Sequence, residues 1–103
     1  MTDNQKPIRL QRRRIKGLSL VSPNGLPIVY VGRPTKWGNP YLIGTYGSRK
    51  DCVEKYRRMI GKDRYGFPAT SQIQAELRGK NLACFCPLDQ PCHADVLLEI
   101  ANG

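Results

Sequence analysis

Short apolar runs that contain β-branched and aromatic residues predict three strands along the chain. The clearest is residues 28–31, Ile-Val-Tyr-Val, which lies between Pro27 and Gly32. Residues 81–85 are apolar enough for a second central strand. Within residues 7–16, apolar positions interrupt a run of cations, which predicts a short strand near the edge of a sheet. Together these segments predict a small sheet.

Apolar residues recur at helical spacing in three other stretches, residues 48–60, 71–78 and 93–101. The first stretch opens with Ser48 and Asp51, whose spacing fits a capping box. The second has a serine at its first position, which we predict as its cap. Helices that alternate with strands favour the α/β fold class, here a small single-domain sheet flanked by about three helices.

The length of 103 residues predicts one domain. We expect residues 1–7 to form a flexible basic N-terminus and residues 8–102 to form the α/β domain. No apolar run approaches the length needed to span a bilayer, and the N-terminus lacks the apolar core of a secretory signal. The expected location is therefore cytoplasmic, with no membrane partner.

The only histidine and three of the four cysteines lie close together in a Cys-x-Cys-x5-Cys-His arrangement of Cys84, Cys86, Cys92 and His93. Thiolate and imidazole are the donors that zinc prefers. In a reducing compartment, clustered cysteines are better explained as ligands or redox thiols than as disulfides. The first hypothesis is a zinc site with these four ligands, at a strand-to-helix junction. Cys52 lies on the apolar side of a predicted helix and is expected in the core.

Two alternatives to a four-ligand site remain open. Adjacent side chains at a helix start diverge by about 100°, so Cys92 and His93 share a metal only if the backbone bends between them. A thiol at a helix N-terminus beside an imidazolium has a lowered pKa, which makes Cys92 a candidate nucleophile with His93. Asp95 then either orients His93 or only favours the helix N-terminus. In the blandest interpretation, the cysteines are small buried hydrophobes and His93 is a polar cap.

Positive charge is concentrated at the N-terminus. The chain has a formal charge of +9, and residues 1–16 supply +5 of it, from six Lys and Arg against one Asp. The run Arg12, Arg13 and Arg14 suits the phosphates of a nucleic acid, or another anionic ligand. The alternative is a solvated arm that only aids solubility.

A second unusual stretch, residues 32–41, follows the clearest predicted strand. It combines cations, an amide and the only tryptophan, at Arg33, Lys36, Asn39 and Trp37. Loops at the ends of buried strands are where α/β proteins bind ligands. We expect the two cations to bind a phosphate and Trp37 to stack on a base. In the alternative interpretation, the aromatic rings fill the core and the cations face solvent.

Four segments, residues 10–14, 29–41, 82–86 and 92–99, resemble the domain of unknown function 4326 family of bacteria and phages. The most specific pieces are Arg-Pro-Thr-Lys-Trp-Gly-Asn-Pro and Cys-His-Ala-Asp. The resemblance covers roughly residues 8–102 and implies no assigned activity. It supports treating the loop and the cysteine stretch as one functional unit.

These observations predict a small zinc-binding protein that engages nucleic acid or a nucleotide. One alternative is an enzyme that acts on a nucleotide or phosphorylated substrate, with a metal-bound water or the Cys92 thiolate as nucleophile. Another is a phage-type effector that binds a host protein through its basic face. The sequence does not predict an oligomeric state.

Overall fold

Three short parallel strands form the sheet of this computed structural model, which describes residues 6–12 and 22–103. They are β1 (Arg9–Gln11), β2 (Ile28–Tyr30) and β3 (Asn81–Cys84), in the order β1-β3-β2. The central strand β3 is buried along its whole length. All three strands lie within the segments that the sequence predicts.

The side chain of Asn81 ties the start of β3 to its neighbours. It is fully buried, and its Oδ1 accepts a hydrogen bond from the backbone N–H of Ile8 at 3.0 Å. Its amide nitrogen donates to Asn24 Oδ1 at 2.8 Å and to Ser22 Oγ at 3.2 Å. Because a buried amide is costly to leave unpaired, these bonds favour one register of the sheet at its amino-terminal edge.

The helices are α1 (Arg49–Met59), α2 (Thr70–Leu77) and α3 (His93–Asn102). The predicted capping box of α1 is confirmed, because Ser48 and Asp51 exchange side-chain-to-backbone hydrogen bonds. The predicted serine cap of α2 is wrong. This helix begins one residue earlier, at Thr70, whose N–H and hydroxyl both donate to the carbonyl of Gly61.

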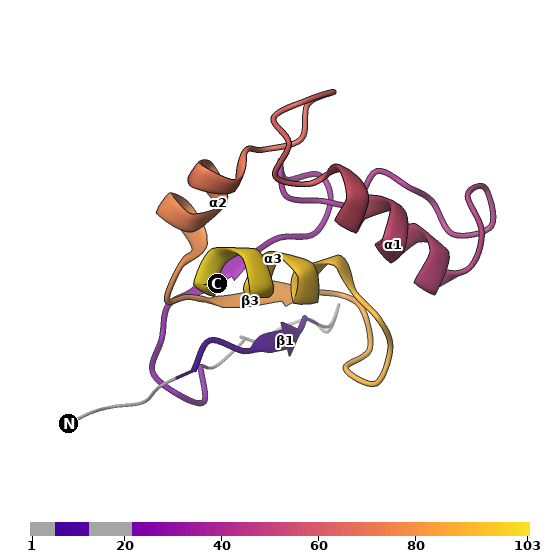
Figure 1. Cartoon of the computed structure of the whole chain (residues 1–103). Helices are drawn as coiled ribbons and strands as arrows, with labels where there is room; N and C mark the ends of the chain where they lie inside the picture. Colours follow the sequence, from indigo (N-terminus) through magenta and orange to yellow (C-terminus); the bar gives the residue numbers. More distant parts are fainter. Residues whose placement is uncertain (1–5, 13–21) are drawn as a thin grey trace.

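Helix α3 lies along β3, and α1 and α2 pack around it on the same side of the sheet (Figure 1). The mixed α/β architecture of three strands and three helices is therefore confirmed. No helix in the described part of the chain is long and apolar enough to cross a membrane. The largest fully buried apolar side chains are Tyr56, Ile73, Leu77, Leu82, Leu97, Val31 and Val96.

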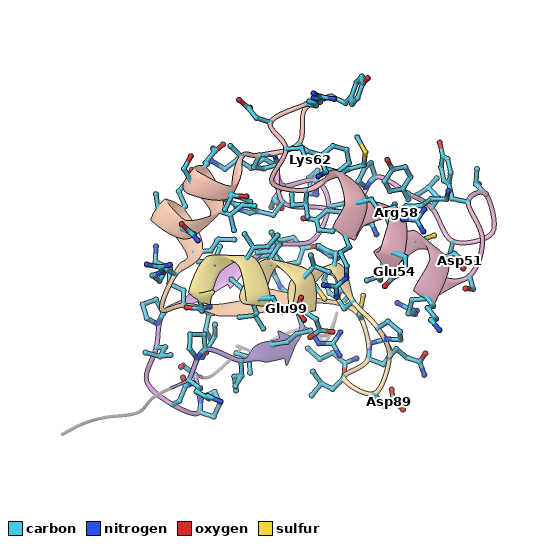
Figure 2. All side chains as sticks on the ribbon, in the orientation of Figure 1. Asp51, Glu54, Arg58, Lys62, Asp89 and Glu99 are labelled. Atoms are coloured by element: carbon cyan, nitrogen blue, oxygen red, sulfur yellow. The ribbon has the colours of Figure 1, made fainter. Side chains whose placement is uncertain are left out.

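One surface ion pair joins α1 to α3. Arg57 of α1 lies 2.6 Å from Glu99 of α3, and it also lies 3.7 Å from Glu54 of its own helix. Figure 2 labels both glutamates. Exposed pairs of this kind contribute about 0–1 kcal/mol each, so the core contacts dominate the packing of these helices.

The loop that follows β2 is fixed to α1 by a buried hydrogen bond. The hydroxyl of Tyr56 donates to the carbonyl of Trp37 at 2.6 Å, and both side chains belong to the core. Burial raises the pKa of Tyr56, so the hydroxyl keeps its proton and remains a donor.

We expect Tyr56→Phe to lower the free energy of unfolding by about 1–2 kcal/mol, because the Trp37 carbonyl loses its donor inside the protein. For a chain of this size, each kcal/mol lowers the melting temperature by about 4–8 °C. Tyr65→Phe is the matched control, because Tyr65 is 85 % exposed. Denaturant unfolding monitored by the fluorescence of Trp37 measures both. Equal stability of the two variants would contradict the role of this bond.

Candidate metal centre and adjoining pocket

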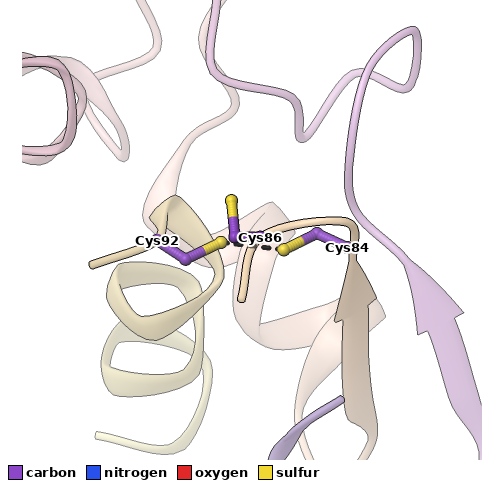
Figure 3. A group of neighbouring side chains, drawn as sticks. All are labelled: Cys84, Cys86 and Cys92. Carbon is purple, nitrogen blue, oxygen red and sulfur yellow. Dashed lines mark hydrogen bonds between the residues drawn. The ribbon is translucent and has the colours of Figure 1, made fainter. Parts of the chain in front are cut away.

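Three cysteine thiols converge where β3 leads into α3. Cys84 is the last residue of β3, Cys86 lies in the following loop, and Cys92 is the N-cap of α3. The three sulfur atoms lie within 4.8 Å of one another, and those of Cys84 and Cys92 are 2.8 Å apart (Figure 3). We call these residues the thiol triad. Thiolates at this separation can hold one metal ion.

The three thiols differ in their electrostatics, and Cys92 is the one whose pKa is lowered. Hydrogen bonds with Cys84 and Cys86 lower the pKa of Cys92 against the opposing effect of burial, and His93 lowers it further. Hydrogen bonds with Cys86 and Cys92, together with burial, raise the pKa of Cys84. For Cys86, a hydrogen bond with Cys84 lowers the pKa, but Cys92 and burial outweigh it. Cys92 also lies at a helix N-terminus, which favours its thiolate.

His93 is not a member of this group of three. Its Nε2 lies 2.7 Å from the carbonyl oxygen of Val31, and its Nδ1 lies 3.7 Å from the Cys92 sulfur. The bond to Val31 turns the ring toward β2, so the four-ligand arrangement that the sequence suggested is not formed here. Three thiols, rather than three thiols and an imidazole, make up the candidate metal site.

Asp95 does not orient His93. Its carboxylate forms an ion pair with Arg9 at 3.5 Å, while the Val31 carbonyl fixes the histidine ring. The sequence-based alternative for Asp95, a carboxylate in the first turn of the last helix, fits its position in α3. Of the three residues considered as a catalytic group, Cys92 and His93 have side chains in contact, whereas Asp95 contacts Cys92 through the backbone.

A pocket of about 300 Å³ adjoins the thiol triad, and all three cysteines line it. Its wall also contains two arginines, Arg33 and Arg49, and several aromatic rings. Among the described residues, no aspartate or glutamate lines this pocket, and neither arginine forms an ion pair. The aromatic and imidazole side chains of the wall are Tyr30, Tyr41, Phe85 and His93.

The four residues of the loop after β2 that the sequence predicts as ligand-binding do not all lie at the pocket. Arg33 lines the pocket, as does Asn39, whose amide is already bonded to the Cys52 carbonyl and the Tyr41 N–H. Lys36 pairs with Glu76 at 2.8 Å instead, on the surface. Trp37 is only 5 % exposed and packs in the core, which agrees with the alternative interpretation of its ring.

Arg12 packs against two aromatic rings of the pocket wall but is not itself a lining residue. Its guanidinium is 5.0 Å from the ring centre of Tyr30 and 5.9 Å from that of Phe85, and both rings line the pocket wall. The other two predicted phosphate-binding residues, Arg13 and Arg14, lie outside the described residues.

Sequence reasoning missed two cations of this region. Arg49 was not singled out, although its position directly after the Ser48 cap signals a helix N-terminus. Arg9 was counted with the basic N-terminal segment, but its side chain is largely buried near Cys92. Cys52 is buried and does not join the thiol triad, as the sequence predicts.

A family model matches residues 10–103, nearly the whole chain. The chain belongs to the DUF4326 family. This family is described as a domain of unknown function, so membership agrees with the resemblance seen in the sequence and assigns no activity. Comparison of this DUF4326 chain with curated proteins and with solved structures gave no match.

We expect the protein to retain metal when it is purified without chelator, and Cys86→Ser to lower the metal content strongly. The variant removes one of three donors, and the half-buried position of Cys86 makes unfolding a lesser concern. Cys52→Ser is the matched control, because Cys52 is a buried cysteine outside the thiol triad. Elemental analysis measures metal per chain. Less than about 0.1 metal per unmutated chain would remove the hypothesis, given how tightly such sites hold metal.

His93→Gln should retain metal at close to the unmutated level, because the imidazole faces the Val31 carbonyl and a glutamine amide can donate to the same oxygen. The measurement is again metal per chain, with circular dichroism to verify folding. A loss as large as that of Cys86→Ser in a folded variant would make His93 the fourth ligand.

Proposed function

We propose that this protein binds zinc through Cys84, Cys86 and Cys92 and binds a nucleotide in the pocket beside them. The main support is that the thiol triad lines a pocket that also contains unpaired cations and aromatic rings. Metal, phosphate and base recognition would then share one concave surface, which is the usual form of a small-molecule site.

The donor set fits zinc. Zinc bound to thiolates has metal–sulfur distances of about 2.3 Å, which separates two sulfurs on a tetrahedral ion by about 3.8 Å. The triad lies within 4.8 Å, and the 2.8 Å between Cys84 and Cys92 requires the two sulfurs to part by about 1 Å. Such a shift is small for cysteines at a strand end and a helix cap.

An anionic ligand is favoured by the charge of the pocket. Arg33 and Arg49 contribute two cations, and the guanidinium of Arg12 lies 5.0 Å from the ring centre of Tyr30, a wall residue. The N-termini of α1 and α3 also border the pocket, through Arg49 and Cys92, and helix N-termini favour negative charge. A phosphate is the biological anion that arginine binds most specifically, through paired hydrogen bonds.

The aromatic wall favours a nucleotide over a simple phosphate ester. Tyr30, Tyr41 and Phe85 line the pocket, and aromatic side chains stack on bases of any sequence. A volume of about 300 Å³ is at the lower end of ligand pockets, which suits one nucleotide better than a polymer. A polymer held mainly along the segment of Arg12 is the competing outcome of the test below.

The second candidate function is an enzyme that acts on a nucleotide or another phosphoester. The observation in its favour is the number of protein ligands that the site offers to the metal. Three protein ligands leave a zinc position open, as in catalytic sites, whereas four close the site. Bound zinc would supply a Lewis acid at the pocket wall. The protein's own residues would bind and orient the phosphate through Arg33 and Arg49.

We expect zinc-loaded protein to bind ATP or AMP in calorimetric titrations, with affinity that falls as salt rises because the contacts are ionic. Arg49→Gln should weaken binding about 10–100-fold, the effect of losing a charged hydrogen bond of about 1.5–3 kcal/mol. Arg58→Gln is the matched control, since Arg58 is an exposed arginine of the same helix that does not line the pocket (Figure 2).

Three results would count against the proposed ligand. Binding that is equal at low and high salt would exclude the ionic contacts. Equal losses in Arg49→Gln and Arg58→Gln would place the ligand outside the pocket. Tight binding of an oligonucleotide with none of ATP or AMP would favour the polymer.

A further inference from the structure

Arg9 is a cation that lies inside the protein, although it belongs to the basic N-terminal segment of the sequence. It is the first residue of β1, and its side chain is only 8 % exposed. In the parallel sheet it lies opposite Leu82 of β3, two residues before Cys84. Its guanidinium reaches the loop that follows β3, between Cys86 and Cys92.

One nitrogen of Arg9 holds the loop between Cys86 and Cys92. Its Nη2 donates to the carbonyl oxygens of Pro87, Leu88 and Gln90, at 3.2, 2.7 and 2.9 Å. These carbonyls belong to the segment that carries the chain from one thiol to the next. A guanidinium at this position fixes the loop path, and with it the separation of the two sulfurs.

The other two nitrogens of Arg9 differ in their surroundings. Its Nε pairs with Asp95 at 3.5 Å, and its Nη1 is buried without a hydrogen-bond partner among the described residues. Burial lowers the pKa of Arg9, but interactions with Cys92, Asp95 and Cys84 outweigh it and raise the pKa overall. A buried donor without a partner is costly unless a nearby negative group compensates it.

We propose that Arg9 is a positioning residue for the metal centre, which holds the loop of residues 87–90 in place and thereby sets the spacing of Cys86 and Cys92. Its side chain is 8 % exposed, whereas that of its ion-pair partner Asp95 is 47 % exposed, so Asp95 offsets the buried positive charge only in part. Three thiolates and one divalent ion would together carry one negative charge, which is opposite in sign to the guanidinium.

This inference rests on the proposed zinc site and extends it to a residue that donates no electron pair to the metal. A positioning role for Arg9 can be told apart from a purely structural role by what each predicts for metal binding. A structural arginine stabilises the fold equally with and without metal. A positioning residue changes the affinity for the metal itself, as outer groups around metal ligands generally do.

The test compares zinc affinity, by competition with a chromophoric chelator, in Arg9→Met, Arg9→Lys and Arg78→Met. We expect Arg9→Met to weaken zinc binding about 10–100-fold. Arg9→Lys keeps the charge without the fork of donors and should recover part of the loss. Arg78→Met is the matched control, since Arg78 also donates to two carbonyls, those of Ala101 and Gly103, at the opposite end of α3.

A second readout needs no metal. Hydrogen exchange of residues 86–92 in chelator-treated protein should accelerate in Arg9→Met and Arg9→Lys and stay unchanged in Arg78→Met. Unmutated protein that binds no zinc would overturn the proposed zinc site. Unchanged zinc affinity and unchanged exchange in folded Arg9 variants would overturn the positioning role. If Arg9→Met does not fold, Arg9→Lys gives the same comparison.

Discussion

The parallel pairing of β3 with both β1 and β2 is the constraint on which the candidate site depends. Because all three strands run the same way, the residues that follow them leave from one edge of the sheet. Arg12 follows β1, Arg33 follows β2 and Cys86 follows β3 at this edge. An antiparallel neighbour would send its following residues from the opposite edge, about 10 Å away for a strand of three residues.

Two helix starts complete the same edge. Helix α1 begins beside the pocket with Arg49, and α3 begins with Cys92 and His93. Helix N-termini present unpaired amide donors and a partial positive charge. The effect at this edge is to favour a thiolate on one side of the pocket and an anionic ligand within it. Acidic side chains such as Glu54 and Glu99 are instead paired with Arg57 outside the pocket.

The elements of this fold follow from local patterns, whereas the site depends on contacts between distant residues. Apolar spacing, the Ser48 box and the glycines after α1 and α2 predict helices to within one or two residues. Gly61 and Gly79 have φ values of 86° and 78°, which glycine adopts without strain. The sequence does not reveal that His93 lies outside the group of three thiols, because its ring bonds to the carbonyl of Val31, 62 positions away. Arg9 resembles Arg12 in sequence, but its carbonyl partners lie 78 to 81 positions further along.

The proposed metal site and the proposed anion site share one edge of the sheet, so the charge of the thiol triad bears on both. Hydrogen bonds with Cys84 and Cys86 lower the pKa of Cys92, which lies at the N-terminus of α3. In the proposed zinc complex, three thiolates and a divalent ion would carry one negative charge. The buried guanidinium of Arg9, which holds the loop between Cys86 and Cys92, is opposite in sign to that charge. Arg33 and Arg49 line the pocket and form no ion pair among the described residues, so both remain available to an anionic ligand.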